Sequence, residues 1–371
     1  MSFNIERVRT DFPYLGSCLY LNTASAGLSW AGQGAAAARF YDQFKVHGYD
    51  GRDDWHAELE RCQRLAAQLL KVTPAEVSFV ASASEALNLV ARAVPLRAGD
   101  QVLMAADEFP SVSLAWSAAP RGVDVVRVPV PQESARTRVL VDAITPRTRI
   151  VAVSHVHWRT GTRVDLARLS AACRERDARL IVDGVQAVGA LDVDASTADF
   201  YTASVFKWLL SGFGLAVMVT RSSFAATLRP ALLGYGNEPP ARTLAYGHAN
   251  HPGICVLTAT LEYLASLGWT AIHERVLRLT GLLIEQLEPL GVQVVTPREA
   301  RAGIVSVAHP DAALCAQRLQ QRNVRIELRG GLIRISPHFY NTETEVEQLA
   351  QLIATECRSW PATPPRPPPC S

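Results

Sequence analysis

The sequence of 371 residues is 48% hydrophobic, which is enough for a large core, and a chain of this length predicts two unequal domains. Its net charge of only +2, without a basic run or a patch of basic and aromatic residues, argues against nucleic acid as a partner. No apolar run approaches the roughly 20 residues of a membrane-spanning helix, so we expect no membrane partner.

Seven cysteines are scattered along the chain, odd in number and without a CxxC pair, so the sequence predicts neither a disulfide framework nor a zinc site. Residues 1–14 mix acidic and basic side chains and lack the apolar core of a signal peptide. A reduced, cytoplasmic enzyme fits these properties best.

Strand and helix patterns alternate from about residue 75 to residue 220. Helical periodicity covers residues 85–94 and 165–177, and Asp165 is the expected N-cap of the second helix. This alternation predicts a mainly parallel sheet covered on both faces, whose ligands bind beyond the carboxyl ends of the strands. The buried strands are predicted over residues 77–80, 101–105, 123–130, 149–155, 179–183, 199–203 and 215–220.

After Pro240 the pattern changes to longer helices and short strands. Thr342 and Glu345 form the expected capping box at the start of the last helix. The predicted helices cover residues 253–267, 271–287 and 346–353, and the predicted strands cover residues 293–295, 303–307 and 332–335. We predict a large domain over residues 21–240, a smaller α/β domain from residues 1–20 and 241–360, and a proline-rich disordered tail over residues 361–371.

The chain contains 34 arginines and only three lysines, Lys45, Lys71 and Lys207. Lys207 follows a predicted strand and lies in an apolar stretch that ends in Gly-Phe-Gly. Arginine suffices wherever a surface charge is needed, so a lysine here indicates a primary amine that can lose its proton and form an imine. A surface lysine lying along its loop is the alternative.

Asp183 ends the otherwise apolar strand predicted over residues 179–183. A buried carboxylate without a cation is costly, and the neighbouring sequence supplies no cation. A protonated pyridine nitrogen would meet this need. Pairing Asp183 with the pyridinium of pyridoxal 5'-phosphate (PLP), and Lys207 through a Schiff base, makes the cofactor an electron sink. A helix cap or turn former is the alternative role for Asp183.

Small residues after the strand over residues 77–80 lead directly into a helix. The backbone N–H groups near Ala83 and the hydroxyl of Ser84 can bind a phosphate at this helix N-terminus, although a simple N-cap shows the same pattern. Ser204, three residues before Lys207, is the second candidate hydroxyl. The chain has no GxGxxG after its first strand and no Walker lysine, which argues against nicotinamide and nucleoside-triphosphate cofactors.

Two patterns are the most specific, Asp183-x-x-Gln186 followed by Ala-Val-Gly, and Ser204-x-x-Lys207-Trp208-Leu209. They resemble the fold-type I PLP enzymes of aminotransferase class V, a group that includes cysteine desulfurases, kynureninases and isopenicillin-N-epimerase-like proteins. The resemblance implies an α/β, fold-type I PLP-dependent transferase fold, with a mainly parallel, seven-stranded sheet in the large domain and a smaller C-terminal α/β domain. Further matches, in the family's order, lie at residues 20–25, 84–88, 154–156, 159–161 and 334–343.

The resemblance also implies a role for each matching residue around the cofactor. Lys207 would form the Schiff base and move the substrate α-proton to give a quinonoid intermediate, while Asp183 would hold the pyridinium. Gln186 would hydrogen-bond the phenolic oxygen, and Phe109 would stack on the pyridine face. The phosphate would be held by Ser84, Ser204 and the backbone of Ala83.

On the substrate side the resemblance assigns the carboxylate of a small amino acid to Arg334, whose planar fork suits a bidentate bond. Asn22 and Ser25 would line the substrate site. Trp158 occupies a place where several relatives have asparagine, and its indole would favour an apolar or aromatic substrate wall unless it is only packing. His248 lies where relatives supply a phosphate contact from the neighbouring subunit, which implies a homodimer with shared active sites; an exposed loop histidine is the alternative.

Departures from the family pattern reduce the number of reaction types that we expect. Where desulfurases place a histidine over the cofactor ring, this chain has Phe109 in a Phe-Pro-Ser pattern, as in kynureninases and epimerase-like members. Residues 325–334 contain no nucleophilic cysteine before Arg334, so persulfide chemistry of the usual kind is not expected. Phe206 replaces the histidine or tyrosine that often precedes the lysine.

His155 and His157 alternate on a predicted strand, but no third ligand recurs nearby, and we expect no metal site. We therefore predict a PLP-dependent lyase that carries out β-elimination or cleaves a carbon–sulfur or carbon–carbon bond. A class V aminotransferase and an amino-acid epimerase are the closest alternatives. A catalytically silent PLP-fold binding protein and a nicotinamide oxidoreductase belong to other classes.

Overall fold

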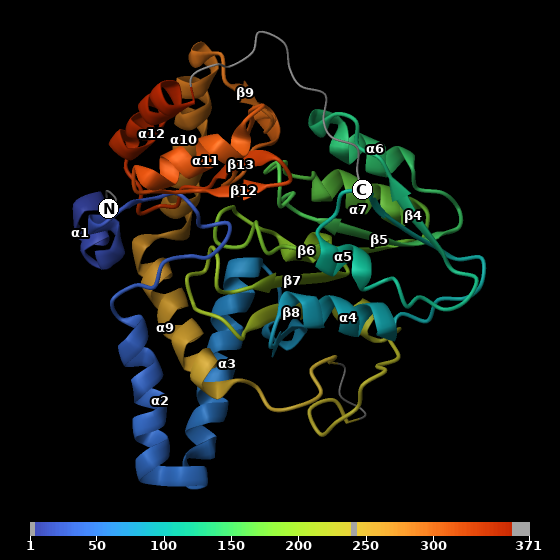
Figure 1. Cartoon of the computed structure of the whole chain (residues 1–371). Helices are drawn as coiled ribbons and strands as arrows, with labels where there is room; N and C mark the ends of the chain where they lie inside the picture. Colours follow the sequence, from blue (N-terminus) through green and yellow to red (C-terminus); the bar gives the residue numbers. More distant parts are fainter. Residues whose placement is uncertain (1–3, 239–242, 358–371) are drawn as a thin grey trace.

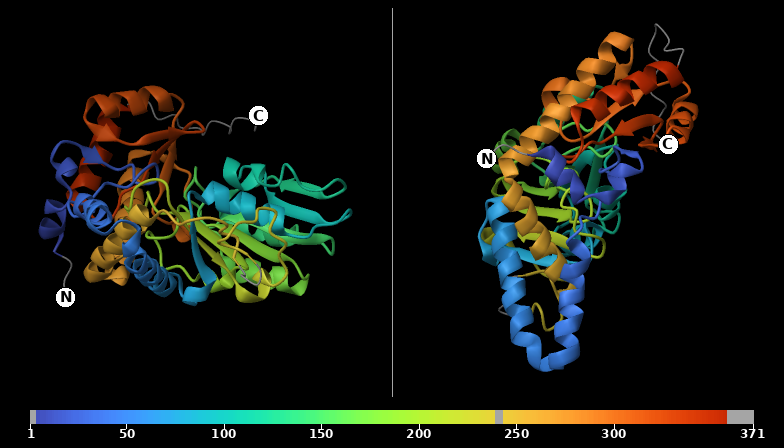
Figure 2. Two further views of the ribbon diagram at one scale, coloured as in Figure 1. Left: turned by 90° about the horizontal axis from the view of Figure 1, so that it is seen from below. Right: turned by 90° about the vertical axis from the view of Figure 1, so that its left-hand side faces the viewer.

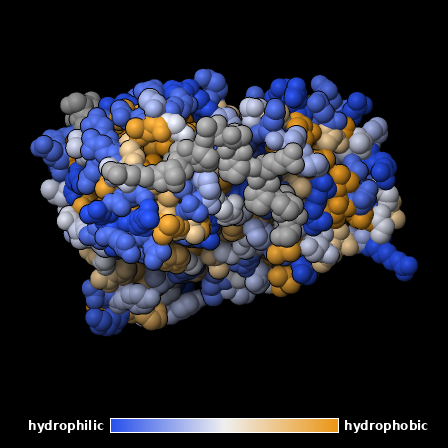
Figure 3. Space-filling model, turned by 45° about the horizontal axis from the view of Figure 1, so that its top comes forward, coloured by the Kyte–Doolittle hydropathy of each residue, from blue (hydrophilic) through white to orange (hydrophobic). Residues whose placement is uncertain are grey.

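The computed structural model describes residues 4–238 and 243–357. The proline-rich tail predicted over residues 361–371 lies outside these residues. Within them, no single helix is long and apolar enough to cross a membrane; two consecutive helices, residues 251–267 and 269–290, meet that criterion only jointly and are bent by 77°. On the face shown in Figure 3, hydrophobic residues form separate small groups among hydrophilic ones.

A seven-stranded sheet lies at the centre of the molecule, in the order β2-β8-β7-β6-β5-β3-β4. Across the sheet, the five strands β4, β3, β5, β6 and β7 run parallel to one another. The strand β8 is antiparallel to both of its neighbours, β7 and β2. This confirms the predicted α/β fold, and all seven predicted strands are present with ends shifted by at most two residues. Their bounds are β2 Val77–Val80, β3 Gln101–Ala105, β4 Asp124–Val128, β5 Thr148–Ser154, β6 Arg179–Asp183, β7 Phe200–Ser204 and β8 Ala216–Thr220.

Alternating side chains of these strands enter two different cores, one on each face of the sheet. On β3, for example, Val102 and Met104 pack with α4, while Leu103 and Ala105 belong to the core on the opposite face. Both faces are therefore covered, as predicted. One face is covered by α4 (Ala83–Ala93), α5 (Pro110–Leu114) and α8 (Ser222–Ala225), and the other by α3 (Arg52–Leu70), α6 (Arg136–Asp142), α7 (Leu166–Glu175) and α9 (His251–Leu267).

A second group of elements lies at the top of Figure 1 and surrounds a separate hydrophobic core. In it, Leu19 and Leu21 pack with residues from Leu279 onward. The side chains of α9 and the first half of α10 instead join the core of the large sheet. The predicted domain boundary at residue 240 stays a prediction. The elements are β1 (Leu19–Tyr20) paired with β11 (Val324–Arg325), the sheet β12-β13-β10-β9 (Glu327–Arg329, Leu332–Ile335, Val305–Ala308, Gln293–Val294), and helices α10 (Trp269–Leu287), α11 (Ala312–Gln321) and α12 (Glu343–Glu356).

Both predicted helix starts are confirmed by their caps. The Asp165 carboxylate accepts the N–H of Arg168 at the start of α7, and Thr342 and Glu345 form the capping box of α12. Since a cap satisfies backbone groups that a helix leaves free, it can be recognised from a few residues.

Two long helices were not predicted, α2 (Gln33–His47) and α3; a short helix, α1 (Ile5–Thr10), precedes them. In α2 only Ala36 and Phe40 are buried, so its sequence has little of the apolar periodicity that marks a helix. Together α2 and α3 form a hairpin that projects from the body, and α9 packs against both helices (Figures 1 and 2).

Candidate active site

The candidate site lies where the parallel strands of the large sheet end. Asp183 is the last residue of β6, and Ser204 is the last residue of β7, three residues before Lys207. Because neighbouring parallel strands end at the same edge of a sheet, these predicted residues come together although up to 24 positions separate them in the sequence.

The Asp183 side chain is buried, and one carboxylate oxygen, Oδ1, accepts the N–H of Val185 at 2.9 Å. Burial raises the pKa of this carboxyl, and the bond from Val185 and the charge of Lys207 act in the opposite direction. No described cation forms an ion pair with it. The second oxygen is thus available for a cation such as a protonated ring nitrogen.

Burial lowers the pKa of the Lys207 amine to about 8, even though Asp183 acts to raise it. The positive charges of Arg334 and Arg329 contribute to this lowering of the pKa. A lysine with this pKa is partly neutral near neutral pH, which is the form that attacks an aldehyde. This pKa suits the role predicted for Lys207 as the reactive amine, which stays a prediction.

Gln186 is buried between two hydrogen bonds. Its Oε1 accepts the indole N–H of Trp208 at 2.8 Å, and its Nε2 donates to the carbonyl of Ala24 at 3.0 Å. An indole only donates and a carbonyl only accepts, so these partners determine the orientation of the amide. One N–H of Gln186 remains for the phenolic oxygen of a bound cofactor.

Serines from three elements meet at the N-terminus of α4. The backbone N–H of Ala83 donates to Oγ of Ser204 at 3.2 Å, and the hydroxyls of Ser84 and Ser111 are 2.6 Å apart. All three predicted phosphate residues are therefore grouped. Ser111, on α5, was not assigned from the sequence; its place in the Phe-Pro-Ser pattern was the available signal. Free N–H groups and hydroxyls at a helix N-terminus suit a phosphate.

Two aromatic rings line the site beside this serine group. Phe109 is 36% exposed, and its ring lies edge-on to that of Trp158 at 5.8 Å between centroids. The indole N–H of Trp158 donates to the carbonyl of Asp107 at 3.2 Å. The exposed Phe109 ring suits stacking on a flat cofactor. Trp158 packs against Phe109, and its backbone carbonyl accepts a hydrogen bond from Arg334.

Arg334 on β13 is only 3% exposed. Its Nη1 donates to the carbonyl of Trp158 at 2.9 Å and its Nη2 donates to Oγ of Ser25 at 2.7 Å, while its Nε has no described partner. Burial lowers its pKa to about 10; nearby Arg329 lowers it further, and Glu327 opposes this. A buried guanidinium with an unpaired N–H is well suited to bind a carboxylate.

The other substrate residues lie next to Arg334. Oγ of Ser25 accepts from Arg334 and donates to the carboxylate of Glu327 at 3.2 Å. Oδ1 of Asn22 is buried without a described partner, and Asn22 forms a backbone bridge with Ser336, two residues after Arg334. The substrate residues predicted from the N-terminal segment and from β13 are thus adjacent.

His248 is not part of this group. It is exposed, its ring lies 4.8 Å from that of Tyr235, and it lines a separate cavity of about 530 Å³ together with His56 and His251. Its predicted contact with the phosphate of a neighbouring subunit stays a prediction.

The side chains of the two buried histidines that follow β5 have hydrogen-bond partners other than Lys207 and the Asp183 carboxylate, although the backbone N–H of His155 donates to the carbonyl of Asp183 at 2.8 Å. His155 hydrogen-bonds the hydroxyl of Tyr201 at 2.9 Å. His157 approaches the carboxylates of Asp107 and Glu133 closely enough for a metal-type cluster, but a guanidinium already bridges both acids. That guanidinium belongs to Arg136, and the guanidinium of Arg159 lies 3.5 Å from the Asp107 carboxylate, so two cations balance the two carboxylates within the protein.

Comparison with known proteins agrees with this geometry. The family model described as Aminotransferase class-V matches residues 36–349, most of the chain. The chain belongs to the aminotransferase class V family. Members of this family are PLP-dependent enzymes, so the chain is an enzyme whose cofactor is PLP.

Several known proteins are similar to this chain. An isopenicillin N epimerase from Amycolatopsis lactamdurans is 30% identical over 78% of this chain and 83% of its own length. A cysteine desulfurase from Klebsiella pneumoniae is 30% identical over 82% and 83%, respectively. A cysteine desulfurase from Thermococcus onnurineus shares the fold with a TM-score of 0.87 at 24% identity, covering 95% of this chain and 98% of that one.

Proposed function

We propose that this class V enzyme is a lyase that acts on a small α-amino acid and breaks a bond at the β-carbon, by β-elimination or by cleaving a carbon–sulfur or carbon–carbon bond. The observation that carries the proposal is that the buried Lys207 amine is under the electrostatic influence of two buried charged groups, Asp183 at the end of β6 and Arg334 on β13.

Bound PLP supplies an electron sink for negative charge that develops at the substrate α-carbon. In this proposal the free oxygen of Asp183 holds the ring nitrogen in its charged form. The remaining N–H of Gln186 holds the phenolic oxygen, and Phe109 covers one face of the ring. The phosphate binds the N-terminus of α4 and the hydroxyls of Ser84, Ser111 and Ser204.

On the substrate side, the unpaired Nε of Arg334 and one of its Nη groups bind the α-carboxylate. Ser25 holds the guanidinium in place, and the free Oδ1 of Asn22 accepts a hydrogen bond at the same wall. With the carboxylate so fixed, Nζ of Lys207 removes the α-proton. Orienting the scissile bond in this way accounts for a large part of catalysis in enzymes generally.

A lyase needs one base, whereas a two-base epimerase also needs a proton donor on the opposite face of the α-carbon. The described residues whose charges or hydrogen bonds reach Lys207 or Arg334 include no histidine, cysteine or tyrosine. This favours one-base chemistry, either elimination or transamination. Epimerisation is the second candidate, because a 30%-identical relative is an isopenicillin N epimerase.

The test begins with the visible absorption of the purified protein after PLP is supplied. We expect a band in the wild type and its complete loss in both Lys207→Ala and Lys207→Arg, because a guanidinium keeps the charge but forms no imine. No band in the wild type, or an undiminished band in the variants, would contradict an enzyme that uses Lys207 and would favour a silent binding protein.

The reaction type is then read from the products. A panel of amino acids is incubated with the enzyme, and keto acid, sulfide, alanine and inverted amino acid are separated. Keto acid formed together with the released β-substituent supports the lyase. Inverted amino acid without a keto acid would support the epimerase, and amino-group transfer to a second keto acid would support the aminotransferase.

We also propose a cytoplasmic homodimer in which His248 of each subunit contacts the phosphate bound by the other. The exposure of His248 and its distance in sequence from the Lys207 group support this proposal. Mixing Lys207→Ala with His248→Ala should then restore one intact site per mixed dimer. Sedimentation as a monomer, or no gain in PLP binding on mixing, would contradict it.

A further inference from the structure

The backbone around Lys207 is held unusually closely by other segments. The carbonyl of Phe206 accepts the N–H of Gly27 at 2.9 Å, and the carbonyl of Lys207 accepts the N–H of Leu210 at 3.3 Å. A Cβ atom on Gly27 would lie 2.0 Å from the Lys207 oxygen, so only glycine allows this approach. Leu210 has φ of 55°, in the left-handed region, because the loop turns sharply after the lysine.

The next carbonyl, that of Trp208, is held by a histidine. Nε2 of His338 lies 3.0 Å from this oxygen, and Nδ1 of His338 accepts the N–H of Phe339 at 2.8 Å. Because Nδ1 is an acceptor, the ring proton is on Nε2, which donates to Trp208. The imidazole is fully buried, and burial lowers its pKa to about 3, so it stays neutral.

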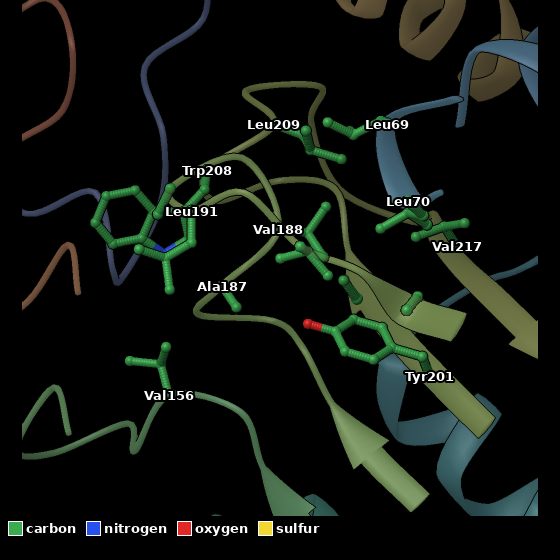
Figure 4. Close-up of a cluster of buried hydrophobic side chains, with 14 of the residues drawn as sticks. Leu69, Leu70, Val156, Ala187, Val188, Leu191, Tyr201, Trp208, Leu209 and Val217 are labelled. Carbon is green, nitrogen blue, oxygen red and sulfur yellow. The ribbon is translucent and has the colours of Figure 1, made fainter. Parts of the chain in front are cut away.

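Trp208 connects His338 to Gln186, which is on the cofactor side of the site. Its indole N–H donates to Gln186, and its ring lies at one edge of a buried hydrophobic cluster that includes Leu191 and Val188 (Figure 4). Glycines approach it closely on two sides: a Cβ on Gly189 would lie 2.6 Å from the Trp208 oxygen, and a Cβ on Gly303 would lie 2.3 Å from its ring. Trp208 therefore has little freedom to move.

His338 also belongs to the substrate side, because it follows Arg334 by four residues. Between them, Oγ of Ser336 accepts the N–H of Ala24, the residue whose carbonyl binds Gln186. The backbone N–H of His338 donates to Oδ1 of Asn341 at 2.8 Å, which fixes the turn after β13. One buried hydrogen-bond network thus joins the lysine loop to the strand that carries the substrate-binding arginine.

We propose that His338 is a positioning residue for Lys207, acting through its hydrogen bond to the carbonyl of Trp208. This rests on the proposed function, in which the Lys207 amine binds PLP and moves the α-proton. The neutral imidazole keeps the peptide between Trp208 and Leu209, the second peptide after Lys207, in one orientation and connects it to the segment after Arg334. The amine is thereby held at a constant place relative to both the cofactor and the substrate carboxylate.

Two substitutions separate this role from general packing. In His338→Gln, the amide N–H reaches about as far as Nε2 and can still donate to Trp208. In His338→Asn, the side-chain oxygen replaces Nδ1 as acceptor for Phe339, but nothing reaches Trp208. Both variants lose the ring, so a purely structural role predicts similar losses of thermal stability and no difference between them at the lysine.

The measurement is the rate at which apoprotein captures PLP, followed by visible absorption, together with the pH at which the absorption of the lysine-bound PLP changes. We expect His338→Asn to capture PLP at least about tenfold more slowly and to shift this pH, because a displacement of about 1 Å can cost on the order of 10²-fold. His338→Gln should capture PLP within about threefold of the wild-type rate.

The control is His309→Asn; His309 lies 3.4 Å from Sγ of Cys315, a residue of the separate core around α10, α11 and α12. Nδ1 of His309 likewise accepts a backbone N–H, from Asp311 at 2.9 Å, and this variant should lose thermal stability without any change in PLP capture. The inference is overturned if His338→Asn captures PLP at the wild-type rate, or if His338→Gln is as slow as His338→Asn. A wild type without a visible band would overturn the proposed function as well.

Discussion

The two sides of the Lys207 site use their buried polar atoms differently. On the cofactor side, at the ends of β6 and β7, both polar ends of the Gln186 amide are hydrogen-bonded within the protein, and the Lys207 loop is held by its neighbours. On the substrate side, Nε of Arg334 and Oδ1 of Asn22 are buried without described partners.

This difference indicates which side is held more firmly before ligands bind, although one oxygen of Asp183 and one N–H of Gln186 on the cofactor side also remain open. A satisfied network costs nothing to maintain and keeps reacting groups in place, whereas an unpaired buried N–H gains a partner when a carboxylate arrives. On the cofactor side, the Gln186 amide and the Lys207 loop therefore already have fixed orientations before a cofactor binds. In the proposed function, the substrate side gains most of its hydrogen bonds when the carboxylate of the amino acid binds.

The largest effect should come from the one free acidic oxygen on the cofactor side. Asp183→Asn keeps an acceptor for Val185 but removes the charge that pairs with the ring nitrogen. We expect turnover to fall on the order of 10²- to 10³-fold and PLP to bind more weakly. Steady-state kinetics and PLP titration check this, with Asp165→Asn, another capping-type acid far from the site, as the control. Unchanged turnover in Asp183→Asn would show that the ring nitrogen is not held there.

A smaller effect, confined to substrate binding, is expected from the other side. Arg334→Gln removes the guanidinium that binds the α-carboxylate, and losing a buried charge partner costs about 2–5 kcal/mol, so KM should rise on the order of 10²-fold with a smaller change in kcat. Arg325→Gln, on β11, which pairs with β1 in a separate sheet, is the matched control and should keep the wild-type KM. An unchanged KM in Arg334→Gln would mean that the carboxylate binds elsewhere.

The pH dependence of PLP capture tests whether both sides act on the lysine. Burial lowers the pKa of Lys207 from 10.5 to about 8, so capture by apoprotein should rise about tenfold per pH unit below that value and level off above it, since only the neutral amine attacks. Arg329→Gln removes a charge that lowers this pKa, and its midpoint should move to higher pH. Asp183→Asn removes a charge that raises it, and its midpoint should move to lower pH. Stopped-flow absorbance across pH measures the three midpoints, and shifts of the same sign would contradict the assignment.

The smallest expected effect concerns the rigidity of the loop that carries Lys207. Gly27→Ala forces a Cβ against the Lys207 carbonyl, and overpacking of this kind costs about 1–3 kcal/mol, so the melting temperature should fall. Gly34→Ala lies in α2, where an added methyl group would have no neighbour within 4 Å, and it should instead raise stability by about 0.5–1 kcal/mol. Equal melting temperatures for wild type and Gly27→Ala would show that the loop yields easily.

Much of the fold could be predicted because its signals are local. The seven strands were visible as short buried runs, and the caps at Asp165 and Thr342 were visible within four residues. The helix α3 was missed although it buries five apolar side chains at helical spacing, a signal that could have predicted it. The helix α2 was missed because it buries only two side chains and depends on α9 for its packing. Helices of that kind are stabilised by tertiary contacts more than by their own pattern.

By itself, the sequence determined the chemistry of the site: a scarce lysine in an apolar loop, an acid at a strand end, and an arginine within an apolar strand. Those features follow from what one side chain can do when it is buried. Only the tertiary structure decided which groups meet, such as Ser111 with Ser84, the unpaired Nε of Arg334, and the contact of His338 with the carbonyl next to Lys207. These contacts join segments up to 130 residues apart, and no local pattern of residues encodes where such segments approach one another.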